Sequence, residues 1–189
     1  MNPIVAVFGP GDVSHDTTLY QNAEALGAAL ARTGYAVLTG GYDGVMEAAS
    51  KGASEAGGHV IAVTAEVYFA RGIVANAFVK REVRVKSATD RLMELIDLSD
   101  AAIAIGVSAG TLVEAMTLWE FTNKKFIKPR PIITIGEDWM KIIHAIAESE
   151  TANDATEIFT CVETPAQAIA KLRTHFGELP TLPSLDVLR

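Results

Sequence analysis

Short apolar runs rich in β-branched residues alternate along this chain with stretches of helical period. This alternation constrains the fold most strongly, because it is typical of a parallel sheet with helices on both faces. The first run, residues 4–8, passes through Gly9 into a helix at about residues 16–32, whose apolar side chains share one face. We therefore predict a Rossmann-like, three-layer α/β/α fold with a mostly parallel sheet of about seven strands.

The other elements are predicted at regular intervals. Further strands are expected at residues 36–39, 59–64, 82–85, 101–105, 132–135 and 158–162. Helices are expected at about residues 45–56, 88–98, 111–124 and 137–148, and a last helix has Thr164 as its cap and Pro165 as its first residue. Residues 65–80 have no clean periodicity. The sequence leaves two interpretations open for them, a functional loop with a short helix or a mobile lid.

The composition is that of a globular protein and argues against several classes. With 189 residues, 49% of them hydrophobic and 21% charged, the chain is expected to form a single domain over residues 1–189. No apolar run reaches the roughly 18 residues of a membrane span and no secretion signal is visible, so a cytoplasmic protein without a membrane partner is expected. A net charge of −7 argues against binding a nucleic acid polymer, although a small anionic ligand needs only a local positive field.

Few side chains of this sequence suit a metal. The single cysteine, Cys161, rules out an internal disulfide and a cysteine cluster. The histidines are scattered over different predicted elements, at His15, His59, His144 and His175. We therefore expect neither a metal site nor a bound cofactor.

Two glycine-containing loops follow predicted strands and mark the candidate binding site. In open α/β sheets ligands bind outside the carboxyl ends of the strands, and glycines let backbone N–H groups approach a phosphate. The alternative is that the glycines only form tight turns. Because two such loops occur, we predict that they bind the phosphate of a nucleotide. The predicted binding residues are Gly9 after the first strand, Gly40, Gly41, Gly44, Val45 and Met46 in the first loop, and Ser108, Ala109, Gly110 and Thr111 in the second.

Two charged residues belong to the same region of the predicted fold. Glu114 lies one turn into the helix after the second loop, so its carboxylate is expected to face the same crevice as the phosphate-binding amides. Its alternative role is to complement the helix dipole. Arg91 lies near the start of the helix before the fifth strand, and its position alone fits a salt bridge as well as a binding site.

Taken in order, these residues resemble the LOG (Lonely Guy) family of cytokinin nucleotide phosphoribohydrolases, within a wider group that includes molybdenum-cofactor carrier proteins. Residues 40–48 resemble the family's first glycine motif. Residues 110–114, Gly-Thr-Leu-Val-Glu, match the end of its Pro-Gly-Gly-x-Gly-Thr-x-x-Glu motif, and Arg91 falls at the place of its catalytic arginine. The resemblance implies that Arg91 and Glu114 act together on the N-glycosidic bond of a nucleoside 5′-monophosphate, releasing the free base and ribose 5-phosphate.

The chemistry of that bond explains why these residue types would be needed. Its cleavage builds positive charge on the sugar, so a carboxylate such as Glu114 would stabilise the transition state or take a proton from the attacking water. Arg91 would orient Glu114 or hold the phosphate and ribose. The leading hypothesis is therefore hydrolysis of a cytokinin-type or AMP-like nucleotide.

Two departures from the family pattern support an alternative. Where the family has Pro-Gly-Gly, this chain has Gly106-Val107-Ser108, so side chains stand where backbone would approach a phosphate. The lysine that usually follows the catalytic arginine is Leu92 here, which removes a positive charge. The alternative hypothesis is a non-catalytic carrier or sensor that binds a nucleotide or a cofactor and resembles the molybdenum-cofactor carriers.

The expected partners are a small-molecule nucleotide and a second copy of the chain. The helix that carries Glu114 has apolar residues on more than one face, which is more than one sheet can cover. These residues are Leu112, Val113, Met116, Leu118, Trp119 and Phe121. They predict a homodimer with the site near the interface, which the resemblance also implies.

Overall fold

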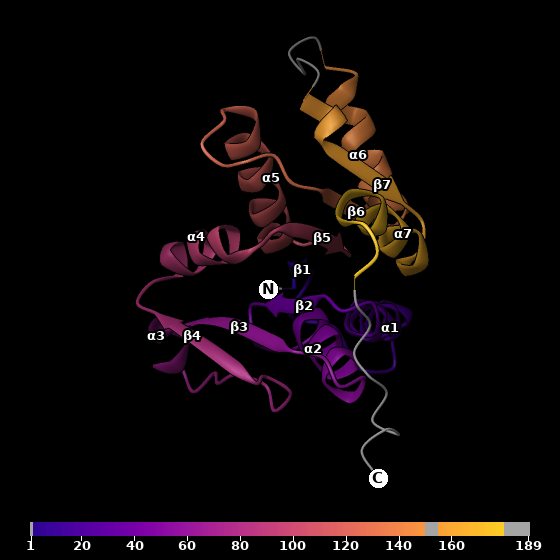
Figure 1. Ribbon diagram of the computed structural model, residues 1–189. Coiled ribbons are helices and arrows are strands. Elements are labelled where there is room, and N and C mark those ends of the chain that lie inside the picture. Colours follow the sequence, from indigo (N-terminus) through magenta and orange to yellow (C-terminus); the bar gives the residue numbers. More distant parts are fainter. Residues whose placement is uncertain (1, 150–154, 180–189) are drawn as a thin grey trace.

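Seven parallel strands form one sheet in the structure, a computed structural model that describes residues 2–149 and 155–179 (Figure 1). All six neighbouring pairs of strands are parallel. The strands are β1 (Ile4–Phe8), β2 (Ala36–Thr39), β3 (Val60–Ala65), β4 (Arg81–Val85), β5 (Ala101–Ile105), β6 (Ile132–Ile135) and β7 (Phe159–Val162). The predicted Rossmann-like α/β fold is confirmed, and this sheet is parallel throughout.

The order of the strands puts a topological switch in the middle of the sheet. The order is β4-β3-β2-β1-β5-β6-β7, so the chain first moves outward from β1 to β4 and then returns to the other side of β1 with β5. The connections that leave β1 and β5 therefore run in opposite directions. In such sheets this arrangement opens a crevice at the carboxyl ends of the two strands, where ligands bind.

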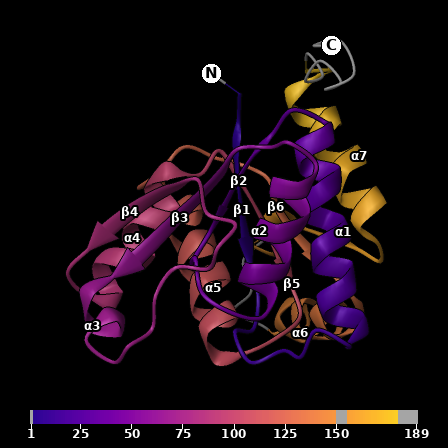
Figure 2. The same cartoon turned by 90° about the horizontal axis from the view of Figure 1, so that it is seen from below.

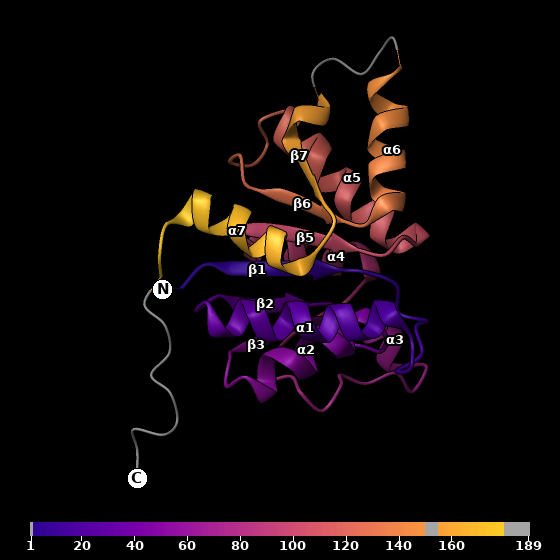
Figure 3. The ribbon, with the colours of Figure 1, turned by 90° about the vertical axis from the view of Figure 1, so that its right-hand side faces the viewer.

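Helices cover both faces of the sheet (Figure 2). One face is covered by α1 (Thr18–Arg32), α2 (Val45–Glu55) and α7 (Pro165–Phe176), and the other by α4 (Ala88–Leu98), α5 (Ala109–Asn123) and α6 (Glu137–Ala147). In Figure 3, α1 and α7 lie in front of the strands. The sheet therefore has two hydrophobic cores, one beneath α1, α2 and α7 and one beneath α4, α5 and α6. Alternate residues of a strand enter these cores; in β5, Ile103 faces the first and Ala102 the second. Burial on both faces explains why the central strands are apolar along their length, whereas the edge strand β4 carries exposed charged residues.

Capping residues set the helix starts that differ from the predicted ones. Helix α1 begins at Thr18, later than predicted, because Thr17 is its N-cap and its hydroxyl accepts the N–H of Tyr20 at 3.2 Å. Helix α5 begins at Ala109, two residues earlier than predicted, because Ser108 is its N-cap. The predicted cap of α7 by Thr164, with Pro165 at the first position, is confirmed.

The segment between β3 and β4 contains a short helix, α3 (Glu66–Phe69), which lies at the carboxyl ends of these strands (Figure 2). This is the short helix that the first of the two interpretations of residues 65–80 includes. Strand β7 begins one residue later than predicted, because Ala155–Ile158 before it form a 3-10 turn. Within the described residues, no helix has both the length and the apolar character needed to cross a membrane.

Candidate functional site

The first glycine loop, residues 40–44, leads into a helix whose start is not capped by a side chain. Gly44 is the N-cap of α2 and has a φ of +65°, in the left-handed region that favours glycine. The N–H of Val45 donates to the carbonyl of Pro10 at 3.0 Å. The next two amides, those of Met46 and Glu47, have no hydrogen-bond partner among the described residues. Free N–H groups at a helix N-terminus attract an anion.

The glycines near this helix are needed for close packing. A Cβ added to any of the four predicted glycines of this region would collide with other protein atoms. The obstructing residues are Val45 and Ile105 at Gly9, Arg91 and Met46 at Gly40, Ala62 at Gly41, and Pro10 and Gly11 at Gly44. The loop therefore offers a ligand the amides of α2 rather than empty space beside its glycines.

The side chain of Arg91 lies directly on the first glycine loop. Helix α4 begins with a capping box between Ser87 and Asp90, so Asp90 serves as the N-terminal acid of the helix. Arg91 follows in the first turn and donates its Nε–H to the carbonyl of Val63 at 2.9 Å. Its Nη2 lies 3.4 Å from the sulfur of Met46. Among the described residues no carboxylate lies within 4.0 Å of this guanidinium, so the salt-bridge interpretation of Arg91 has no partner there.

Two tyrosines that the sequence analysis did not single out complete the surroundings of Arg91. Its Cζ lies 5.1 Å from the ring centroid of Tyr42 and 5.8 Å from that of Tyr68. Asn76 joins the segment that carries Tyr68 to the first glycine loop, because its side-chain N–H groups donate to the carbonyls of Gly41 and Tyr42. No motif marks Tyr68 or Asn76 in the sequence, since their partners in the site, Gly41, Tyr42 and Arg91, lie more than twenty positions away along the chain.

The hydroxyls of the second loop are directed at one another. The Oγ of Ser108 accepts the N–H of Thr111 at 3.2 Å and lies 2.8 Å from the Thr111 hydroxyl. Thr111 is buried, with 1% of its surface exposed. The amides of Ala109 and Gly110 have no hydrogen-bond partner among the described residues. As at the first loop, backbone N–H groups rather than side chains are left for an anion.

Glu114 lies in the second turn of α5 and is partly buried, and its carboxylate has no hydrogen bond to any described residue. Burial raises the pKa of its carboxyl to about 7, although the positive charge of Arg91 acts in the opposite direction. The two side chains interact electrostatically but form no ion pair within 4.0 Å. Near neutral pH this carboxyl is therefore present both as an acceptor and, when protonated, as a donor. The structure thus brings Arg91 and Glu114 together with the N-termini of two helices: α2, which has no side-chain cap, and α5, which is capped by Ser108.

A cavity of about 490 Å³ lies on the other side of the second loop, beside α1 and the start of α6. Its walls include Gly106 and Val107, and three carboxylates surround it, those of Glu137, Asp138 and Glu163. Trp139 is buried there and donates its indole N–H to the carbonyl of Gly106 at 2.9 Å. The negative charge of this cavity disfavours a phosphate, so an anion is better placed at the first loop.

Comparison with protein families identifies the group to which these features correspond. The SLOG cluster4 family matches residues 2–169. A relative from Archaeoglobus fulgidus, an uncharacterized protein, is 31% identical over 133 residues, which cover 70% of this chain and 83% of the relative.

Two solved structures extend the likeness over nearly the whole chain. The molybdenum cofactor binding protein of the phototrophic bacterium Rippkaea orientalis is 26% identical with a TM-score of 0.76, over 93% of this chain and 98% of that one. A Moco carrier protein of Chlamydomonas reinhardtii is 26% identical with a TM-score of 0.68, over 92% and 97%. The predicted likeness to the wider group is thus confirmed, whereas the specific likeness to phosphoribohydrolases stays a prediction.

Proposed function

This chain belongs to the SLOG cluster4 family, and on that basis we propose that it binds a small heterocyclic molecule through its phosphate and acts as a carrier or sensor. The observation that carries the proposal is the Arg91 guanidinium, which lies on Gly40 without a carboxylate partner among the described residues. Beside it, α2 begins with two amides that have no partner there. A fixed guanidinium next to a free helix N-terminus suits a phosphate.

The class of ligand follows from the similar structures and from the charges at the site. Proteins named for binding or carrying the molybdenum cofactor resemble this chain at 26% identity, and that cofactor is a pterin that carries a phosphate. The residues present fit such a group, because Arg91 has three N–H donors beyond the two that contact Val63 and Met46. Glu114 in its protonated form would add a donor for the ring or for an oxyanion.

Binding is tested by titration calorimetry with AMP, GMP and the molybdenum cofactor, on the unmodified protein and on the Arg91→Met variant. We expect saturable binding of at least one of the three. Because a hydrogen bond to a charged group contributes about 1.5–3 kcal/mol, the variant should bind at least about tenfold more weakly. If none of the three binds to the unmodified protein, the proposal is wrong.

A second candidate function, hydrolysis of the N-glycosidic bond of a nucleoside 5′-monophosphate, is favoured by Glu114. A carboxyl whose pKa is about 7 is partly ionised at neutral pH and can take a proton from water. In that reaction the water oxygen attacks the anomeric carbon, the bond to the base breaks, and the base leaves with a proton. Arg91 would hold the phosphate, so that its binding positions the sugar.

Product analysis separates the two candidates. The protein is incubated with AMP and with N6-substituted adenine nucleotides, and free base and ribose 5-phosphate are measured beside a Glu114→Gln control. Release that is lost in the control would support the hydrolase. Saturable binding without release, in the presence of an intact fold, would leave the carrier or sensor.

A further inference from the structure

The guanidinium of Arg91 is surrounded by contacts from four separate elements. Val63 in β3 accepts its Nε–H at 2.9 Å, and Met46 in α2 lies 3.4 Å from Nη2. The ring of Tyr42 in the first glycine loop and the ring of Tyr68 in α3 lie beside it, with centroids 5.1 and 5.8 Å from Cζ. Such ring contacts attract a cation while leaving its N–H groups free for hydrogen bonds.

The two rings are held differently. Tyr42 is buried, with 7% of its surface exposed; its hydroxyl accepts the N–H of Ala65 at 2.9 Å and its carbonyl accepts from Asn76 at 3.0 Å. Tyr68 is half-buried and meets the Tyr42 ring edge-on, at a centroid distance of 5.2 Å and an angle of 61°. Tyr42 thus belongs to the framework of the loop, whereas the Tyr68 side chain is attached to it through ring contacts.

We infer that Tyr68 is a positioning residue for Arg91, holding the guanidinium on the first glycine loop with its remaining donors available to a phosphate. This inference rests on the proposed anion site. A free arginine side chain samples many rotamers, and ordering it on binding weakens affinity. Contact with the Tyr68 ring restricts these rotamers before the ligand arrives, so the ring contributes to affinity without touching the ligand.

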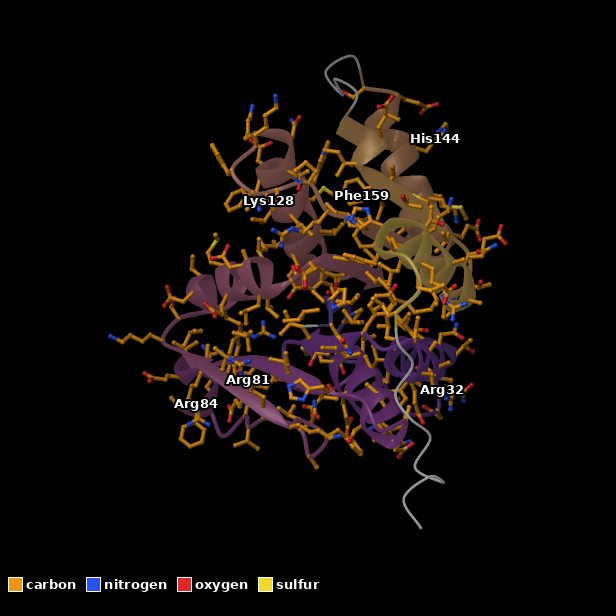
Figure 4. All side chains as sticks on the ribbon, in the orientation of Figure 1. Arg32, Arg81, Arg84, Lys128, His144 and Phe159 are labelled. Atoms are coloured by element: carbon orange, nitrogen blue, oxygen red, sulfur yellow. The ribbon has the colours of Figure 1, made fainter. Side chains whose placement is uncertain are left out.

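The neighbouring residue provides a matched control. Phe69 stands next to Tyr68 in α3, with 52% of its surface exposed, and its ring lies 4.9 Å from the guanidinium carbon of Arg84. Arg84 is an exposed residue of β4 (Figure 4), and it pairs with Glu82 at 3.1 Å. Phe69→Leu therefore removes an equivalent ring–arginine contact from the same helix without affecting Arg91.

The first measurement needs no ligand. In ¹H–¹⁵N spectra of the full chain, the Nε–H signal of Arg91 is identified by its absence in Arg91→Met. We expect it to be protected from exchange and shifted by the rings in the unmodified protein and in Tyr68→Phe. In Tyr68→Leu the shift and part of the protection should be lost, while Phe69→Leu should leave the signal unchanged.

The second measurement is calorimetry of the same variants with AMP and GMP. Because a ring–cation contact is worth about 0.5–2 kcal/mol, Tyr68→Leu should bind about two- to thirtyfold more weakly, with Tyr68→Phe restoring the affinity. Tyr68→Leu should have no further effect in the Arg91→Met background.

An unchanged Arg91 signal in Tyr68→Leu would overturn the inference whether or not a ligand binds. If the signal changes as expected but neither nucleotide binds, the positioning role is retained and AMP and GMP are excluded as ligands of the anion site.

Discussion

Arg91 contacts its surroundings as a planar fork rather than as a point charge, and this makes lysine a poor replacement. In Arg91→Lys the positive charge is kept, but the N–H bond to Val63 and the contacts of the flat guanidinium with two tyrosine rings are lost. We expect AMP binding to weaken about tenfold, or about 1.4 kcal/mol. Arg84→Lys is the matched control, since Arg84 lies in β4 and pairs with Glu82. Equal affinity of Arg91→Lys and the unmodified protein in calorimetry would show that charge alone matters.

Glu114 makes the stability of the protein depend on pH. Its carboxyl has a pKa of about 7 when folded, against 4.5 as the ordinary value. The folded chain therefore keeps a proton that the unfolded chain has already lost, and stability from this group is complete below pH 4.5 and is lost as the pH rises through about 7. Glu114→Gln removes this dependence.

Urea unfolding at pH 5 and pH 8 measures the effect. When the pH is raised from 5 to 8, the free energy of unfolding should fall by about 2 kcal/mol more in the unmodified protein than in Glu114→Gln. Other titrating groups are shared by the two proteins, so they cancel in the difference. Parallel pH dependence of the two proteins would mean that the Glu114 carboxyl is ionised over the whole range.

At the scale of elements, the start of α5 depends on the hydroxyl of Ser108. Ser108→Ala removes the partner of the Thr111 N–H and of the Thr111 hydroxyl, which is buried. The loss of an N-cap should lower the free energy of unfolding by about 1 kcal/mol. Thr164→Ala, at the start of α7, removes an equivalent cap and should cost a similar amount.

The same pair of variants tests whether Ser108 contacts a ligand. Its hydroxyl is engaged within the helix start, so Ser108→Ala should leave the affinity for AMP within about twofold of the unmodified protein. Thr164→Ala should do the same. A larger loss confined to Ser108→Ala would show that the hydroxyl turns toward the ligand and that Ser108 is a binding residue, as predicted from the sequence.

The elements that the sequence predicted well are those whose signals are local. Alternating strands and helices are recorded in nearby residues, and caps such as Thr164 lie within three positions of the groups they bind. Residues 65–80 lack such signals, because α3 is only four residues long and the segment is joined to the loop of β2 by Asn76, some thirty-five positions away. Tertiary contacts of this kind leave no periodic pattern in the sequence.

For the molecule as a whole, the order of the strands explains which part of the site could be anticipated. Parallel strands bring all their carboxyl ends to one edge, so the two glycine loops and Glu114 were predicted to meet there, whereas Arg91 was assigned to the site by the family resemblance. The roles of the individual groups were not predictable, because they depend on packing between distant segments. At Gly40, for example, the missing Cβ makes room for Arg91, and at the second loop Ser108 caps a helix.

We also predict that two copies of the chain associate as a homodimer. Helix α5 and the loop after it expose large apolar side chains, with Val113 53% and Phe126 72% exposed. Exposed apolar groups beside a candidate site favour an interface, here with a second copy of the chain. We expect sedimentation velocity to show a dimer that Val113→Asp converts to a monomer. Val74→Ser, at a position 60% exposed in the segment after α3, should leave the dimer intact. Since Val113 adjoins Glu114, a dimer unaffected by Val113→Asp would place the interface away from the site. A monomer at all concentrations would contradict the predicted homodimer, and the site would then consist of residues from one chain.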